Sequence, residues 1–367
     1  MNYKIQISKP NLGLKELKAI REVFKSGMVV QGPRVEELER EFSKYVGTKY
    51  GIATSSGTTA LHVAALSAGI REGDEVIVPS FSFVATANCI LYCNAKPVFA
   101  DINEDDYNID PDDIQKKITP KTKAIIPVHL YGQSADMKAI MDIAEDKKLI
   151  VIEDACQAHG AEFENKKVGS FGIGVFSFYA TKNMTTGEGG MITTNDEKIN
   201  EISRMIRSHG SKQRYYHEIL GYNYRMTDIQ AAIGLVQLKN LEKNNKKRIK
   251  NAKMLTRGLK NIPGIITPKI MPNRKHVFHQ YTIRITKDFG ISREELIKKL
   301  EEKGIQTIIY YPLPIHKQRL YLNLGYNVHL PVTEKLENEI LSLPVHPLLK
   351  KEDVNYIIES IGELSKR

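Results

Sequence analysis

The lysine with the most specific surroundings in this sequence is Lys182, in the segment FSFYATKNMTTGEGG (176–190). Small and hydroxyl-bearing residues flank it, and Gly187, Gly189 and Gly190 close the loop between two β-rich runs. A lysine amine that is partly desolvated loses its proton more easily and can then form a Schiff base with a carbonyl compound. The alternative for this loop is a tight hairpin that carries a solvated lysine.

A candidate acid lies in the segment LIVIEDACQAHG (149–160), where an apolar run ends at Asp154. A carboxylate in this position could keep a pyridine nitrogen protonated, because an opposite charge favours the charged form. Gln157 lies in the same turn and could reach an oxygen on such a ring. Acids at strand ends also cap loops or bind metals, so this segment alone does not decide between these roles.

A candidate phosphate site begins the segment SSGTTALHVAALSAG (55–69), in which Gly57 and Thr58 lead into an apolar helical pattern. The free N–H groups and the dipole of a helix N-terminus attract a phosphate, and glycine allows close approach. Ser177 could offer its hydroxyl to the same phosphate. The glycine spacing of a dinucleotide or P-loop motif is missing, so a single phosphate fits better; simple helix capping is the alternative.

An aromatic residue for the face of a ring comes from PSFSFVATANCI (79–90), where we favour Phe83 over Phe81. A core role is the alternative for both phenylalanines. Taken together, the four segments supply a Schiff-base lysine, a ring-nitrogen acid, a phosphate cradle and a stacking ring. This combination predicts a pyridoxal 5'-phosphate (PLP) site.

Short β-rich runs alternate with helical patterns from residue 50 to about 195. The predicted strands span 50–55, 74–80, 95–101, 122–130, 149–155, 174–180 and 189–195, and the predicted helices span 58–69, 83–92, 111–117 and 136–147. This alternation indicates an α/β fold with a mostly parallel sheet and helices on both faces. Ligands of such sheets bind at the carboxyl ends of the strands, where we expect the four segments to meet.

The length of 367 residues exceeds one compact core and indicates two domains. We predict a large cofactor-binding domain over 1–245 and a smaller α+β domain over 246–367, while a helix at 14–26 could pack on either. A long helical pattern begins at Asp228, which we interpret as an N-cap. For the smaller domain we predict strands over 279–285 and 305–311 and helices over 292–303, 332–341 and 351–365.

The net charge of +10 allows a nucleic-acid surface, but no zinc-finger, RNA-recognition or helix-turn-helix pattern supports one. The basic run at 239–260 has helical spacing, with Leu241, Ile249, Met254 and Leu259 as apolar anchors, and we interpret it as a solvated helix face. We therefore expect no nucleic acid as a partner.

No apolar run approaches the roughly 20 residues that span a bilayer, and the amino-terminal residues do not resemble a signal peptide. We expect a cytoplasmic protein without membrane insertion. Cys89, Cys93 and Cys156 are too few for a disulfide framework, and no second Cys or His pair has the spacing of metal ligands. We expect reduced cysteines and no metal.

The segments, in this order, resemble the nucleotide-sugar aminotransferases of the DegT family, which are PLP enzymes of fold type I (aspartate-aminotransferase-like). The resemblance covers nearly the whole chain. It is carried by SSGTTALH (55–62), PSFSFVATAN (79–88), EDACQAHG (153–160), SFYATKNMTTGEGG (177–190), RSHG (207–210), GYNYRMTDIQAAIGLVQL (221–238) and YYPLPIHKQ (310–318). It implies a large domain with a mostly parallel sheet and a smaller α+β C-terminal domain.

The resemblance implies a role for each matching residue. Lys182 would form the Schiff base and move the proton, and Asp154 would pair with the ring nitrogen. The other implied cofactor contacts are Gln157 to the ring, Gly57, Thr58 and Ser177 to the phosphate, and Phe83 by stacking. Asn223 matches a phosphate contact from the neighbouring subunit, which implies a homodimer with shared active sites.

The reaction implied is amino transfer from an amino acid, with L-glutamate as the expected donor, onto a nucleotide-linked keto sugar, a 3-keto or 4-keto deoxyhexose. A lysine at position 182 favours amino transfer over the dehydration performed by family members with histidine there. Arg225 and His316 are candidate partners of the diphosphate, and Tyr310 and Tyr311 are candidate substrate contacts by stacking or through their hydroxyls. Each could instead be structural. The alternatives are a keto cyclitol as substrate, or a regulator that keeps PLP without turnover.

Overall fold

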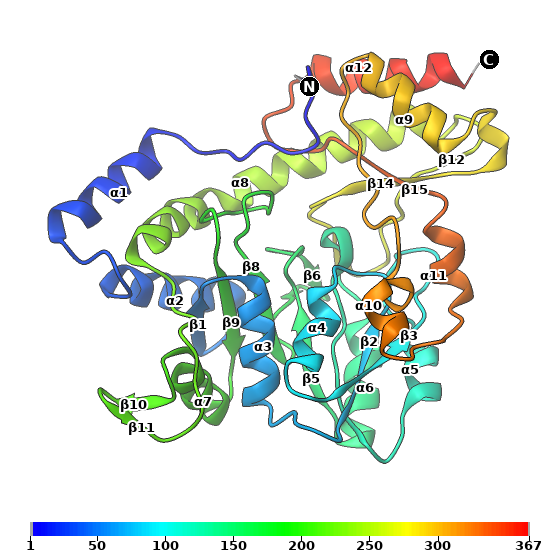
Figure 1. The fold of residues 1–367 in the computed structure, drawn as a ribbon. Coiled ribbons are helices and arrows are strands. Elements are labelled where there is room, and N and C mark those ends of the chain that lie inside the picture. Colours follow the sequence, from blue (N-terminus) through cyan, green and yellow to red (C-terminus); the bar gives the residue numbers. More distant parts are fainter. Residues whose placement is uncertain (1–2, 366–367) are drawn as a thin grey trace.

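A seven-stranded sheet forms the centre of the larger part of the molecule in the computed structural model, which describes residues 3–365 (Figure 1). Its strands are β1 (Tyr50–Thr54), β2 (Glu75–Pro79), β3 (Lys96–Ala100), β4 (Thr122–Ile125), β5 (Ile150–Asp154), β8 (Ile173–Ser177) and β9 (Gly190–Thr194). They lie in the order β1-β9-β8-β5-β4-β2-β3. Only the two pairs that involve β9 are antiparallel, so the predicted mostly parallel α/β sheet is confirmed.

Helices cover both faces of this sheet because its strands are apolar on both sides. They are α2 (Pro33–Val46), α3 (Gly57–Ser67), α4 (Ala85–Leu91), α5 (Pro111–Lys117), α6 (Met137–Lys147) and α7 (Glu197–Arg207). On one face Ile152 and Val175 pack with residues of α3 and α4. On the other face Val151 packs with residues of α5 and α6, and Phe176 packs with residues of α2.

A second core lies in the C-terminal part, where the strands β12 (Ile265–Ile266), β14 (Tyr281–Ile285) and β15 (Ile340–Leu343) form a sheet. The helices α9 (Arg293–Glu302) and α12 (Lys351–Leu364) pack on it, which matches the predicted α+β character. Ile5 belongs to this core, so the amino-terminal segment contacts the C-terminal part.

The remaining elements are short or peripheral. They are α1 (Leu14–Ser26), α10 (Arg319–Asn323), α11 (Pro331–Leu336), β6 (Glu162–Phe163), β7 (Lys166–Lys167), β10 (Ser211–Gln213), β11 (Tyr216–His217), β13 (Arg274–Lys275) and the 3-10 turns Leu130–Gly132, Lys287–Phe289 and Ile315–Lys317. Between residues 3 and 365 no helix is both long and apolar enough to cross a membrane.

The longest helix, α8 (Asp228–Leu259), contributes to both cores (Figure 1). Leu235 and Leu241 pack with the large sheet, whereas Leu255 and Leu259 pack in the C-terminal core. The predicted domain boundary after residue 245 falls inside this helix, and it stays a prediction.

Two predictions for the C-terminal part are wrong. The segment 305–311 is not a strand, because Ile305 bridges Ile5 and Ile308 bridges Ser342, so no continuous ladder forms. The predicted helix 332–341 stops at Leu336, and the chain then enters β15, whose residues are all buried and pair with β14. In both cases tertiary pairing decides the local structure, which a periodic pattern does not reveal.

Asp228 is not the N-cap of α8 but its first residue, and the cap is Thr227, whose hydroxyl accepts the N–H of Gln230 at 3.3 Å. The Asp228 carboxylate instead accepts N–H groups at the start of α2, from Gly32 at 2.9 Å, Arg34 at 3.1 Å and Val35 at 3.0 Å. A helix N-terminus has unpaired N–H groups and a positive dipole end, so a buried carboxylate from another helix satisfies both.

Replacement of Asp228 by alanine should lower the free energy of unfolding by about 2–4 kcal/mol, because one buried and two partly buried N–H groups lose their acceptor. Denaturant titration followed by circular dichroism measures the change. The matched control is Asp142→Ala, which removes an exposed carboxylate paired with Lys138 and should change stability by less than about 0.5 kcal/mol. Equal effects of the two substitutions would contradict the capping role.

Candidate active site

The carboxyl ends of the parallel strands β1, β5 and β8 meet at one edge of the sheet, together with the loop after β2. A cavity of about 580 Å³ opens there, a size that suits a cofactor with its substrate. Nine of the predicted site residues line it: Gly57, Thr58, Phe83, Asp154, Gln157, Ser177, Lys182, Tyr310 and Tyr311.

Lys182 lies in the loop that connects β8 to the antiparallel strand β9, at this same edge. The loop is held by its own backbone, with the N–H of Lys182 donating to the carbonyl of Tyr179 at 2.9 Å and that of Thr186 to the carbonyl of Phe178 at 3.0 Å. Gly187 has φ +84°, a left-handed conformation that favours glycine. Burial lowers the pKa of the Lys182 amine, although nearby Cys156 and Asp154 act in the opposite direction.

Asp154 is the last residue of β5, and its side chain is 5% exposed. One carboxylate oxygen accepts the hydroxyl of Thr86 at 2.8 Å, and the other accepts the N–H of Cys156 at 3.2 Å. Each oxygen keeps a further lone pair, so the carboxylate can also accept a bond from a protonated ring nitrogen in the cavity.

The cradle for a phosphate lies at the start of α3, where Ser56 caps the helix by accepting the N–H of Thr59 at 3.1 Å. The N–H groups of Gly57 and Thr58 belong to the first turn and have no acceptor within the helix. A β-carbon on Gly57 would lie 2.6 Å from the β-carbon of Ser177. The absence of a side chain at position 57 therefore leaves space between these N–H groups and the Ser177 hydroxyl.

Gln157 and Tyr311 form one side of the cavity. The Gln157 carbonyl accepts the N–H of Tyr131 at 2.9 Å, and its amide nitrogen donates to the Tyr311 hydroxyl at 3.1 Å. The hydroxyl of Tyr131 donates to the carbonyl of Tyr310. Phe83 lies beside Tyr311, with the ring centroids 6.1 Å apart, and 52% of its surface is exposed. An exposed aromatic face at the cavity wall is available to cover a flat ligand.

Three predicted residues lie outside the cavity. Asn223 and Arg225 are exposed on the segment before α8. His316 is buried, shares a 2.6 Å hydrogen bond with the Ser80 hydroxyl and lies 6.3 Å from Phe99 between ring centroids. Its predicted contact with substrate finds no support in this geometry, because the ring is used inside the protein.

The chemistry of these groups fits PLP. The cavity offers an amine with a lowered pKa, a buried carboxylate for a ring nitrogen, an uncovered aromatic face and a helix N-terminus whose glycine leaves room for a phosphate. A cofactor with an aldehyde, a pyridine ring and a single phosphate uses all four.

Comparison with known proteins agrees with this assignment. The model of the DegT/DnrJ/EryC1/StrS aminotransferase family matches residues 10–362. The chain belongs to this family.

Two curated relatives illustrate its range. The "Pleiotropic regulatory protein" of Geobacillus stearothermophilus is 47% identical over 95% of this chain and 93% of its own length. The GDP-perosamine synthase of Caulobacter vibrioides is 38% identical over 98% of both chains. Among solved structures, NtdA of Bacillus subtilis with bound cofactor PMP, the amine form of PLP, has a TM-score of 0.88 and 34% identity and covers 100% of this chain and 88% of its own. The predicted family, fold type and cofactor are thereby confirmed at the level of the family.

Several cavity residues of this DegT-family chain escaped sequence reasoning. Thr86, which fixes Asp154, lies in the quoted segment 79–90 but carries no signal of that role. His279 and Gln280 come from the chain just before β14. Burial, with the charges of Lys182 and Arg248, lowers the pKa of His279 well below its usual value, so this ring is neutral. Only the folded chain brings these residues beside Lys182.

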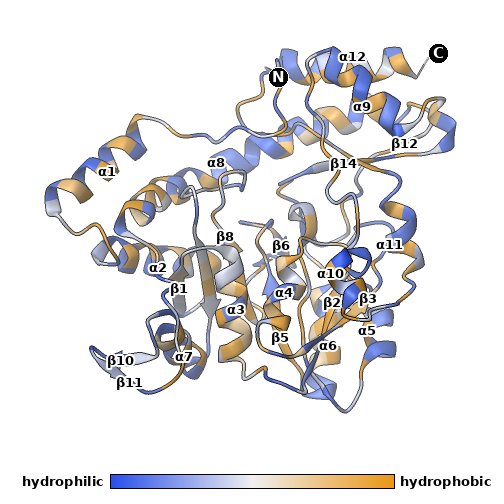
Figure 2. Ribbon diagram, viewed as in Figure 1, coloured by the Kyte–Doolittle hydropathy of each residue, from blue (hydrophilic) through white to orange (hydrophobic). Residues whose placement is uncertain are grey.

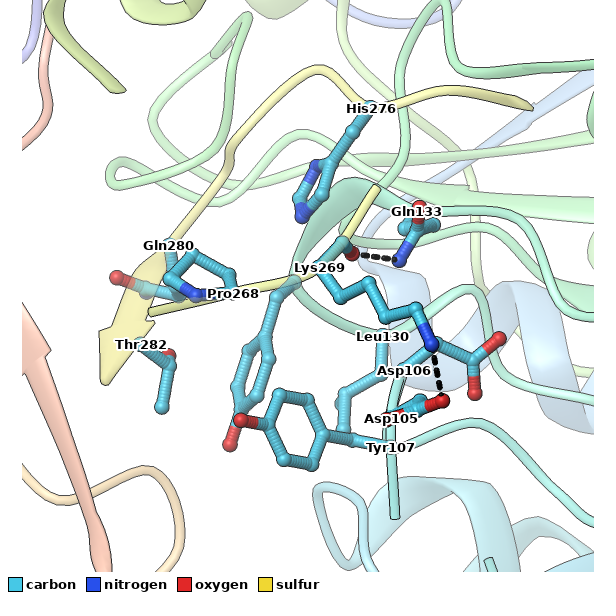
Figure 3. Close-up of a pocket in the computed structure, with 11 residues that line it drawn as sticks. Asp105, Asp106, Tyr107, Leu130, Gln133, Pro268, Lys269, His276, Gln280 and Thr282 are labelled. Carbon is cyan, nitrogen blue, oxygen red and sulfur yellow. Dashed lines mark hydrogen bonds and ion pairs between the residues drawn. The ribbon is translucent and has the colours of Figure 1, made fainter. Parts of the chain in front are cut away.

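A second space of about 10 Å³ adjoins the active site through Gln280 and has room for no more than a water molecule (Figure 3). Lys269 crosses it, donating to Asp105 at 2.5 Å, and its carbonyl accepts the Gln133 amide at 3.0 Å (Figure 3). These bonds hold the segment before β14 against the large sheet. Closer to the active site, the N–H of Gln280 donates to the carbonyl of Tyr131 at 3.2 Å, which fixes the position of Gln280.

Lys182 should react with aldehydes at lower pH than an exposed lysine, because a lowered pKa leaves more neutral amine as the pH falls. Reductive methylation of cofactor-free protein at a series of pH values, with peptide mass spectrometry, measures this for each lysine. The exposed Lys123 in the same sample is the internal control. Parallel pH profiles for the two lysines would contradict the prediction.

Replacement of Gly57 by alanine should weaken PLP binding about tenfold or more, since a methyl group fills the cradle and 1.4 kcal/mol is a factor of ten. Fluorescence titration with PLP measures the affinity. Gly13→Ala is the matched control, because no atom lies within 4 Å of a β-carbon there. Unchanged affinity in Gly57→Ala would place the phosphate elsewhere.

Proposed function

We propose that this chain is a PLP-dependent aminotransferase that moves an amino group from L-glutamate onto a nucleotide-linked keto sugar, a 3-keto or 4-keto deoxyhexose. The proposal depends on one observation: a lysine with a lowered pKa shares a cavity with a buried carboxylate and a phosphate cradle. Family membership supports the reaction class, and the GDP-perosamine synthase among the relatives supports the substrate class.

When bound, PLP supplies the electron sink that stabilises negative charge at the substrate carbon. The chain supplies the rest. Asp154 would keep the ring nitrogen protonated, and Thr86 and the N–H of Cys156 hold its carboxylate in one orientation. The Lys182 amine would accept the proton from the substrate carbon, a task that requires an amine able to change protonation near neutral pH.

The remaining cofactor contacts follow from the cavity wall. The N–H groups of Gly57 and Thr58 and the hydroxyl of Ser177 would bind the phosphate. Gln157 has one amide hydrogen beyond its bond to Tyr311, and this could reach the ring oxygen. Phe83 would cover one face of the ring.

A nucleoside diphosphate needs cationic partners. Within residues 3–365 the charged side chains of the cavity wall are Lys182, Asp154 and Glu188, so no cation remains for the diphosphate if Lys182 binds the cofactor. We infer that a second copy of the chain completes the site, with Asn223 at the cofactor phosphate and Arg225 near the diphosphate. Both are exposed and lie outside the cavity of their own chain. Tyr310 and Tyr311 would contact the sugar from within the cavity. The cytoplasmic location stays a prediction.

The test is a pair of half-reactions. Addition of L-glutamate to the PLP-loaded protein should convert the visible absorption band to that of the amine form, and Lys182→Ala should abolish turnover. Added 3-keto and 4-keto nucleotide hexoses should then be aminated, as read by mass spectrometry and NMR, whereas keto cyclitols should not. Absence of any conversion would favour a regulator that binds PLP without turnover. The Geobacillus relative carries the name of a regulatory protein, which is why this alternative is tested.

Mixing inactive variants tests the shared site. Lys182→Ala and Asn223→Ala should each be poorly active alone, and unfolding and refolding them together should restore about a quarter of wild-type activity, because half of the dimers regain one intact site. Gel filtration verifies the dimer. If the mixture is no more active than its components, Asn223 acts within its own chain.

A further inference from the structure

A line of positive charge runs along α8 and is separate from the active site. Its members are Lys239, Lys243, Lys246, Lys250, Lys253, Arg257 and, directly after the helix, Lys260. The spacing alternates between four and three residues, so with 3.6 residues per turn all seven side chains leave the helix on one side. We call this set the cationic stripe.

All members of the cationic stripe are exposed, and none forms an ion pair within residues 3–365. The neighbouring acid on the helix, Glu242, is already bound to Lys275 and to the Tyr45 hydroxyl. Figure 2 shows the middle of α8 coloured as hydrophilic. Like charges three or four residues apart repel each other along a helix, so the stripe opposes helix formation unless an anionic partner neutralises it.

The opposite side of α8 explains how the helix tolerates this repulsion. Leu241, Leu255 and Leu259 are fully buried, and Arg248 is buried between them without a carboxylate partner. The helix is therefore held rigid by two cores while its outer side presents a straight row of cations about 30 Å long, at 1.5 Å per residue. The row is part of the folded protein rather than of a loose tail.

A straight, rigid row of this length fits a flat anionic surface, because all seven cations can touch a plane at the same time. The phosphate strands of duplex DNA wind around the axis once in about 34 Å, so they meet a straight row over only part of its length. No aromatic side chain interrupts the row, as bases of single-stranded nucleic acid would require for stacking.

We propose that the cationic stripe docks the enzyme on the surface of a bilayer that contains anionic phospholipids. The contact is electrostatic and peripheral, and it requires no apolar insertion. Clusters of four to eight lysine or arginine residues on a helix have this property, and each cation near the surface adds to the attraction. This goes beyond the proposed transamination, since none of the residues assigned to it lies on the outer side of α8.

The experiment is sedimentation of the PLP-loaded full-length protein with vesicles at 150 mM salt. The vesicles contain either phosphatidylcholine alone or seven parts phosphatidylcholine to three parts phosphatidylglycerol. The test variant replaces Lys243, Lys246, Lys250 and Lys253 by glutamine. The control variant replaces four exposed lysines away from α8, Lys44, Lys116, Lys123 and Lys198, and so has the same net charge.

The expected result is binding of the wild-type and control proteins to the anionic vesicles only, with a loss of about tenfold or more in partitioning for the test variant. Circular dichroism and glutamate half-reaction rates should be equal in all three proteins, so failure of the docking proposal is distinct from failure of the proposed reaction. The proposal is overturned if the wild-type protein stays in solution, or if the control variant loses binding as much as the test variant. Equal stripe-dependent binding to a DNA duplex at the same salt would also overturn it, in favour of a general polyanion surface.

Discussion

Burial disfavours the ammonium form of Lys182, although the carboxylate of Asp154 in the same cavity would favour it. The balance between these two effects sets the chemistry of the site, because the amine must give up a proton while the acid stays charged. The hydrogen bonds from Thr86 and from the Cys156 N–H hold the Asp154 carboxylate in a fixed orientation. Exposure of the cavity to water would raise the pKa of the Lys182 amine, because burial is the main cause of its lowered value.

The sheet makes this pairing possible through strand direction. Asp154 and Ser177 end neighbouring parallel strands, and the antiparallel β9 returns the chain through the same edge, so the loop with Lys182 has to cross above them. The first turn of α3 arrives there because it follows β1 directly. The catalytic groups thus come from four separate segments, while their positions are fixed by backbone pairing that is far more rigid than the loops themselves.

The strands and most helices of the large sheet could be predicted because their apolar runs are bounded by clear turns. Seven of the cavity residues could be named because they lie at or directly after the ends of those strands. The errors lie where distant contacts decide. The run at 305–311 has the composition of a strand but changes partner between Ile5 and Ser342. The role of His316 at the diphosphate stays a prediction, since its ring hydrogen-bonds Ser80 and lies beside Phe99. Asp228 resembles a local cap but serves another helix.

Because α8 supplies side chains to both hydrophobic cores, one continuous helix joins the large sheet to the C-terminal part. Loss of either core would expose the apolar side chains that α8 buries there, and the repulsion along its outer side would then promote fraying of that part of the helix. For this reason we expect that the C-terminal part does not fold independently of the large sheet. Its unfolding should be cooperative with that of the large sheet, which positions Lys182.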